Sequence, residues 1–165
     1  MSTVSHAAST GTITFTGKLD ASTCDVSVDG QSEDATVVLP TVSTNSLKKA
    51  TDTTGRTGFN MELKNCTGTL TTASAFFEAG ANVDTTTGRL KNTVVGGADS
   101  VSLQLLDGTN SKVIKAGDQS QTQDNSFTSI ASGSAVLPYA VQYYAEGATT
   151  PGEVSSSVVY SIQYK

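Results

Sequence analysis

Tryptophan is absent from this chain, and histidine occurs only once, as His6 in a polar segment. With one histidine in a polar segment, a nucleophile–base pair or a histidine-based metal site is hard to assemble, and no phosphate-binding glycine loop is present. The carboxylates are scattered, and neighbouring pairs such as Glu33 and Asp34 are typical of turns and surfaces. We therefore expect no enzyme, no metal and no cofactor. The rival enzymatic hypothesis is a secreted sandwich enzyme that uses a carboxylate pair.

Basic residues and long apolar runs are also scarce. The formal net charge is −5 and no basic run exceeds Lys48 and Lys49, which argues against binding to nucleic acid or to anionic membrane surfaces. No apolar run approaches the roughly 18 residues that a membrane-spanning helix needs. Residues 1–8 have neither a basic nor an apolar region, so we expect no signal peptide within this chain. A mature secreted chain would look the same.

Serine and threonine are what the chain has in abundance: 47 of its 165 residues, together with 15 glycines and only 3 prolines. β-Branched residues recur in short runs, which favours strands over helices. The length suits one domain. Strand signals, with apolar residues alternating or in short runs, lie at residues 12–16, 36–39, 59–64, 75–77, 101–105, 112–115, 136–144 and 158–164.

Helical signals are nearly absent. The best candidate is a single turn at residues 46–50, which Thr44 or Asn45 could cap. Turn pairs such as Asp29–Gly30 and Asp107–Gly108 separate the strand signals at hairpin-like spacings. Many short strands with this punctuation indicate one all-β domain, a sandwich or a barrel.

Cysteine is limited to Cys24 and Cys66, and two interpretations are open. The pair could be two buried thiols in a reducing compartment, or one disulfide in an oxidising one. Each cysteine lies at the edge of a strand-like run with no metal partner nearby, which favours the disulfide. The bond would close a loop of about 40 residues and would place folding in the periplasm, at the cell surface or in the medium.

Several short strings, taken in order, carry a family resemblance. Residues 11–17 (GTITFTG) precede Cys24, and residues 58–66 (GFNMELKNC) end on the second cysteine. Residues 138–144 (PYAVQYY) are followed by Gly152, fourteenth from the C-terminal end, and by Tyr164, the penultimate residue. In this order and spacing, from residue 11 to residue 165, the chain resembles the major subunits of chaperone–usher pili, the type 1 fimbrial family in particular.

The resemblance implies an all-β fold: an incomplete immunoglobulin-like β-sandwich completed by a donor strand from a neighbouring subunit. A sandwich that lacks one strand exposes core side chains and an unpaired edge, which β-strand addition covers. The resemblance also implies a bond between Cys24 and Cys66. It divides the chain into a donor-strand extension, residues 1–15, and one pilin domain, residues 16–165. The inserting face of the donor is expected to consist of Ala7, Ser9, Gly11, Ile13 and Phe15.

The implied function is that of a structural subunit of a bacterial pilus shaft, which polymerises by donor-strand exchange and supports adhesion. The implied partners are identical subunits in a helical polymer, a periplasmic chaperone and an outer-membrane usher, with a host receptor as a further candidate and no nucleic acid. The protein would pass through the periplasm to an extracellular fibre. Chaperone recognition is expected at an edge strand that carries Gly152, Val158, Tyr160, Ile162 and Tyr164. The alternative is a minor or tip subunit that binds a receptor or glycan.

Overall fold

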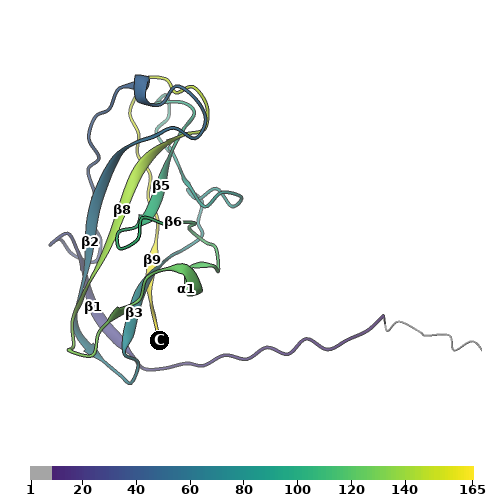
Figure 1. The fold of residues 1–165 in the computed structure, drawn as a ribbon, viewed down its shortest axis with the longest axis vertical. Coiled ribbons are helices and arrows are strands. Elements are labelled where there is room, and N and C mark those ends of the chain that lie inside the picture. Colours follow the sequence, from purple (N-terminus) through teal and green to yellow (C-terminus); the bar gives the residue numbers. More distant parts are fainter. Residues whose placement is uncertain (1–8) are drawn as a thin grey trace, which may run out of the picture.

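The computed structural model describes residues 9–165, which form two antiparallel β-sheets packed face to face (Figure 1). The strands are β1 (Thr23–Val28), β2 (Thr53–Thr67), β3 (Thr72–Phe77), β4 (Leu90–Lys91), β5 (Val101–Asp107), β6 (Val113–Ile114), β7 (Thr128–Ser129), β8 (Ala135–Ala145) and β9 (Tyr160–Tyr164). The helical elements are the 3-10 turn η1 (Thr44–Ser46) and the short helix α1 (Gln121–Asp124). Among the described residues, no helix is long and apolar enough to cross a membrane.

The larger sheet has the strand order β1-β2-β8-β5-β4, and β6 also pairs with β5. The smaller sheet has the order β7-β3-β9, so β9 lies at a sheet edge. The central pair, β2 and β8, runs from Leu63 opposite Ala135 to Thr53 opposite Tyr144, with a shift of register between Thr54 and Thr57. The fold is therefore an immunoglobulin-like sandwich in which the last strand of the chain, β9, is an edge strand.

The core lies between the two sheets. Met61 and Leu63 from β2 and Phe77 from β3 are almost fully buried there. The ring of Tyr139 in β8 packs edge-to-face on Phe77, with the ring centroids 5.2 Å apart. Its hydroxyl accepts a hydrogen bond from the backbone N–H of Ala75 in β3 at 2.8 Å, so this side chain ties the two sheets together. Burial raises the pKa of Tyr139, which keeps the phenol neutral.

A disulfide joins Cys24 in β1 to Cys66 in β2, 42 residues apart along the chain. The two strands pair antiparallel, from Thr23 opposite Thr67 to Val28 opposite Met61. The bond therefore fastens the first strand of the sandwich to its neighbour, and the disulfide interpretation of the two cysteines is confirmed.

Most of the expected strands form where the sequence places them. Residues 59–64 lie within β2, residues 75–77 within β3, residues 101–105 within β5 and residues 136–144 within β8. The expected strand at residues 112–115 is reduced to β6, and the last strand begins at Tyr160 rather than at Val158.

Three expectations are wrong for the isolated chain. Residues 12–16 and residues 36–39 are not strands, because neither stretch has a partner strand among residues 9–165. The helical turn is η1 rather than residues 46–50. The cap lies earlier than expected, since the Ser43 side chain accepts a hydrogen bond from the N–H of Asn45 at 3.1 Å.

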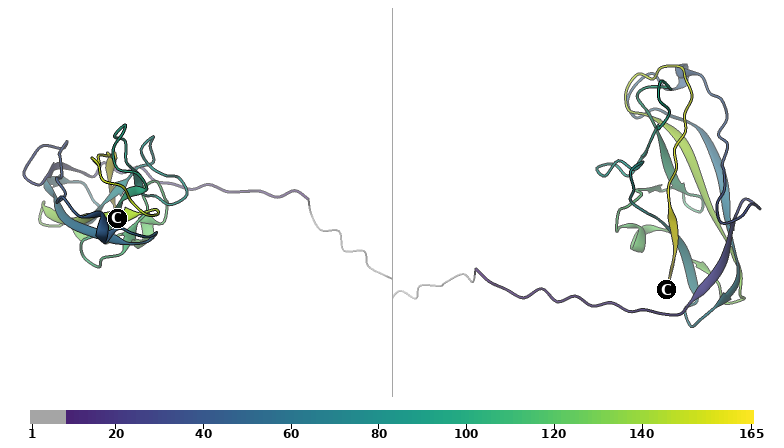
Figure 2. Two further views of the ribbon diagram at one scale, coloured as in Figure 1. Left: turned by 90° about the horizontal axis from the view of Figure 1, so that it is seen from above. Right: turned by 180° about the vertical axis from the view of Figure 1, so that it is seen from behind.

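Residues 9–19, which we call the tail, run as an extended segment away from the sandwich (Figures 1 and 2). The tail leaves the same end of the molecule at which the C-terminus lies (Figure 2). Side-chain contacts with the body of the fold begin at Asp20, whose carboxylate accepts a hydrogen bond from the Thr69 hydroxyl at 2.9 Å. Every described residue from Ser9 to Leu19 is exposed.

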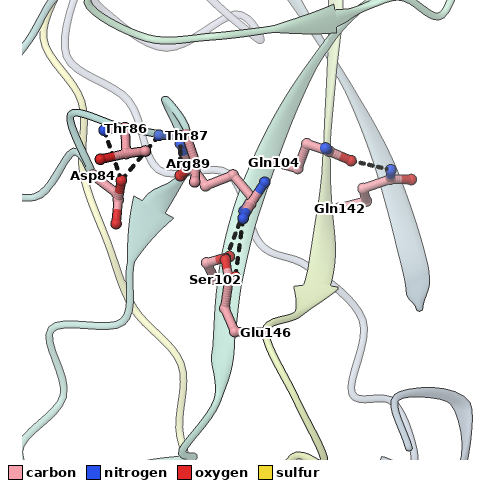
Figure 3. Close-up of polar contacts among 8 residues, drawn as sticks. All are labelled: Asp84, Thr86, Thr87, Arg89, Ser102, Gln104, Gln142 and Glu146. Atoms are coloured by element: carbon pink, nitrogen blue, oxygen red, sulfur yellow. Dashed lines mark hydrogen bonds and ion pairs between the residues drawn. The ribbon is translucent and has the colours of Figure 1, made fainter. Parts of the chain in front are cut away.

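The outer face of the larger sheet carries a group of interlocked polar side chains (Figure 3). Arg89 forms two parallel hydrogen bonds to the Glu146 carboxylate, at 2.6 and 2.9 Å, and its guanidinium lies 3.9 Å over the ring of Tyr144. The Ser102 hydroxyl donates to the same carboxylate at 2.7 Å. This surface satisfies its own hydrogen-bonding groups within one subunit.

Candidate intermolecular strand site

A groove of about 900 Å³ opens into the core between two segments of chain that belong to no strand. We call residues 33–42 the first rim and residues 149–159 the second rim; Tyr160, the first residue of β9, also lines the groove where the second rim ends. Its floor consists of core side chains from both sheets: Phe59, Met61, Phe77, Leu103, Leu105 and Val141. The groove therefore exposes apolar core surface over much of the length of the sandwich.

The first rim follows β1 and is extended without belonging to either sheet. Val37 and Leu39 point inward and are half-buried, whereas Val38 between them is 80% exposed. This alternation is that of a strand. The backbone N–H and C=O groups of residues 37–39 have no hydrogen-bond partner among the described residues. The first rim is thus a strand-like segment without a neighbouring strand.

The second rim leads into β9 and has one satisfied side. Thr93 donates its backbone N–H to the carbonyl of Ser155, and Glu78 donates to the carbonyl of Val159, each at 2.8 Å. The alternating residues Val154, Ser156 and Val158 have half-buried side chains, and their backbone groups have no partner among the described residues. Since N–H and C=O groups alternate sides along an extended chain, the second rim presents a free edge.

Ser156 on the second rim carries the one buried side-chain oxygen without a hydrogen-bond partner in the described part of the chain. A buried polar atom of this kind is uncommon in native structures and costs free energy. Its position on the rim agrees with a groove that a segment of another molecule completes. The sequence gives no sign of this residue's role, because it lies in a run of three serines.

The described donor residues lie on the tail, which runs away from the sandwich (Figures 1 and 2). Ile13 is 78% and Phe15 is 88% exposed, which is costly for side chains of this size. Ser9 and Gly11 are exposed on the same segment. Ala7 and His6 lie outside the described residues.

The residues expected to form the recognition edge lie in and before β9. Tyr160, Ile162 and Tyr164 pair with Phe77, Ala75 and Ala73 of β3, and Val158 lines the groove just before the strand. Burial raises the pKa of Tyr160 and of Tyr164.

Gly152 precedes this edge and has φ +153. A Cβ atom there would lie 2.5 Å from the backbone nitrogen of Ala98, so the close approach of these two segments requires glycine.

Comparison with known proteins gives consistent relatives. The type-1 fimbrial protein A family matches residues 39–165. The chain is 46% identical over 162 residues to the major fimbrial subunit SMF-1 of Stenotrophomonas maltophilia, covering 95% of this chain and 94% of that protein. It is 41% identical over 159 residues to the F17 fimbrial protein of Escherichia coli, covering 94% and 87%.

The fold is similar to that of a solved pilus subunit. The crystal structure of the P pilus rod subunit PapA superposes with a TM-score of 0.63 at 19% identity, covering 86% of this chain and 99% of that one. The open groove, the paired cysteines and the sequence relatives agree with one another. The chain therefore belongs to the type-1 fimbrial protein family, and it is a structural subunit of the shaft of a bacterial surface fimbria.

Proposed function

We propose that the tail of one subunit fills the groove of the next, so that each copy completes the sandwich of its neighbour. The observation that carries this proposal is the match between an open apolar groove and an extended tail with exposed apolar residues. In this arrangement residues 1–15 act as the donor extension and residues 16–165 as the pilin domain. The inserting face consists of Ala7, Ser9, Gly11, Ile13 and Phe15.

The dimensions of the two partners support this pairing. The stretch from Ser9 to Phe15 and the stretch from Thr36 to Val42 each contain seven residues, which span about 23 Å at the rise of a β-strand. The backbone groups of residues 37–39 on one rim, and of Val158 on the other, are free to pair with a strand laid between them. Such a strand would join the two sheet edges that the single subunit leaves open.

Burial of the donor side chains supplies much of the driving force. Ile13 and Phe15 would each contribute about 1.5–3 kcal/mol if they moved from water into the groove. Ser9 and Gly11 are smaller, and they suit a shallower part of the groove, where the two backbones approach closely. The threonines at positions 12, 14 and 16 would then face outward.

Transport and assembly require that the groove be covered before the fibre forms. We infer that a periplasmic chaperone covers the edge formed by Gly152, Val158, Tyr160, Ile162 and Tyr164, and that an outer-membrane usher mediates the exchange. An unfilled groove exposes an aggregation-prone edge, which supports this inference. The assembled subunits would reach the cell surface and support adhesion, with a host receptor as a further candidate partner.

We propose no catalytic role for the subunit. The relatives reported above are named as a fimbrial protein and as a major fimbrial subunit. A tip subunit that binds a glycan is less favoured, because a major fimbrial subunit matches almost the whole chain.

The proposal is tested by disabling one face of the tail at a time. Phe15→Asp in the full-length chain places a charge on the inserting face, and we expect it to abolish the ladders of polymers that resist sodium dodecyl sulfate without heating. Thr14→Asp places the same charge on the opposite face and should leave the ladders in place. Equal polymer formation by the two variants would contradict donor-strand exchange.

A further inference from the structure

Within the described part of the chain, one hydrogen bond joins the two sides of the groove. The hydroxyl of Tyr160, at the end of the second rim, donates to the backbone carbonyl of Glu33 in the first rim at 2.6 Å. The two residues are 127 positions apart in the chain, and both line the groove. The Tyr160 ring is half-buried, so it extends across the groove rather than outward into solvent. The contact crosses the space that the donor strand would enter.

The first rim has few other attachments to the sandwich. Gln31 forms two hydrogen bonds with the backbone of Thr36, which are local to the same segment. The Tyr143 hydroxyl, from β8 in the larger sheet, donates to the carbonyl of Pro40 at 2.9 Å. Together with the packing of Val37 and Leu39, these contacts hold the rim in place. Of the side-chain hydrogen bonds that the described residues make to the first rim, only the one from Tyr160 comes from the opposite side of the groove.

We propose that Tyr160 and Glu33 form a clasp that holds the two rims of the unfilled subunit together and that opens when a donor strand inserts. The inference rests on the proposed function, since it takes the tail of a second copy as the inserting strand. A strand between the rims must reach the free backbone groups on both sides, and the clasp restrains the distance between them. Once the strand is in place, its backbone hydrogen bonds join the two rims, and the clasp no longer contributes.

This role predicts faster insertion of the donor strand, and an affinity that is tighter by the same factor. The clasp stabilises the unfilled state and is broken when the strand enters, so its removal should accelerate insertion. Because the filled state lacks the clasp, dissociation of the inserted strand should not change. The loss of one net hydrogen bond corresponds to an acceleration of about 2- to 12-fold.

The test uses the full-length chain with its own tail disabled by Ile13→Asp and Phe15→Asp. A fluorescent peptide of residues 7–18 serves as the donor, and stopped-flow anisotropy gives its association and dissociation rates. Tyr160→Phe removes only the hydroxyl and keeps the ring in the core. We expect association to be about 2- to 12-fold faster with dissociation unchanged. An unchanged or slower association would overturn the clasp.

Tyr143→Phe is the matched control, since it also removes a tyrosine hydroxyl that binds a carbonyl of the first rim. This bond does not come from the opposite rim, so we expect no comparable acceleration. Equal acceleration by both variants would mean that the rim is merely loosened, and would overturn the clasp. If the peptide binds none of the proteins, the donor-strand proposal itself fails, whereas binding to all of them at one rate removes only the clasp.

A second measurement covers the case in which the substitution perturbs the fold. Amide hydrogen exchange of the unfilled Tyr160→Phe protein should accelerate at Thr36, whose N–H in the first rim donates to the side chain of Gln31, and remain unchanged along β5. Acceleration in β5 as well would show general destabilisation, and no acceleration at Thr36 would show that the hydrogen bond restrains nothing. Either result would overturn the proposal.

Discussion

The outer face of the larger sheet and the groove present opposite states of hydrogen bonding in one small protein. On the outer face, the amide of Gln142 donates to the amide oxygen of Gln104 at 2.8 Å, beside the Arg89–Glu146 pair (Figure 3). In the groove, the backbone groups of residues 37–39 and of Val158 have no partner among the described residues, and Ser156 carries an unsatisfied hydroxyl. The polar groups of the outer face find their partners within one chain, whereas several of those in the groove do not.

This difference shows where the fold depends on another molecule. Buried polar groups in native proteins almost always have partners, and sheet edges are usually covered. The groove departs from both rules, since it holds an unpartnered buried hydroxyl and uncovered backbone edges. These groups all lie on its two rims. An incomplete region with a defined shape indicates that another molecule completes it. The tail of another copy has the exposed apolar residues that such a groove would bury.

The largest effect is expected where the groove depends on the finished part of the fold. The first rim follows β1 after a short turn, and the Cys24–Cys66 bond fastens β1 to β2. Replacing both cysteines by serine should lower the free energy of unfolding by about 4 kcal/mol, the chain-entropy value for a loop of this size. Urea unfolding of the oxidised protein and of the variant checks this. An unchanged midpoint and slope would contradict a structural bridge.

A smaller effect should separate satisfied from unsatisfied polar groups. Gln142→Ala leaves the amide of the buried Gln104 without its partner and should cost about 1–3 kcal/mol. Ser156→Ala removes a hydroxyl that has no partner in the unfilled subunit, so it should leave stability unchanged or raise it slightly. Chemical unfolding of the unfilled proteins measures both. If Ser156→Ala lowered the free energy of unfolding more than Gln142→Ala, the contrast between the two regions would be wrong.

The smallest effect concerns pH and the outer face. The hydrogen bonds from Arg89, followed by that from Ser102, hold the pKa of Glu146 below its usual value of 4.5. A carboxyl whose pKa is lower in the folded state stabilises the fold above its unfolded pKa. That stability is lost as the pH falls below 4.5 and through the folded pKa.

The carboxylate is partly exposed, so the contribution is about 0.2–1 kcal/mol. Stability measured from pH 6 to pH 3 should fall more steeply for the native chain than for Glu146→Gln. Parallel profiles would show that the ion pair adds nothing to the folded state.

The sequence predicts those strands whose partners lie in the same chain. β5 and the middle of β2 carry alternating apolar residues, and both strands find neighbours in the larger sheet. Pro138 interrupts the apolar run of β8, yet the strand continues through it. The ladder to β5 ends at the pair Asp107 and Tyr139, so the proline sits beyond that neighbour and removes no hydrogen bond from it.

The sequence fails where pairing is short or depends on tertiary contacts. β7 has two residues and no apolar pattern, and it forms because β3 lies beside it. α1 carries the buried Gln121, whose side chain accepts from the N–H of Phe77 and donates to its carbonyl, both at 2.9 Å. A polar residue that satisfies a distant strand leaves no local signal.

The candidate site divides in the same way. Alternation at residues 12–16 and 36–39 correctly marks extended segments, but it cannot say that their partners are absent from the chain. The tail and the first rim therefore look like ordinary strands in the sequence. Only the fold shows that both are unpaired, and that a groove lies beside one of them.

Amide hydrogen exchange on the assembled fibre tests the central claim most directly. If the tail of one copy fills the groove of the next, the amides of residues 9–16 and those of residues 37–39 should exchange rapidly in the unfilled subunit. In the fibre both sets should become protected together, as the ladder forms on each side of the inserted strand. A fibre in which the amides of the tail still exchange as fast as in the single subunit would contradict the account.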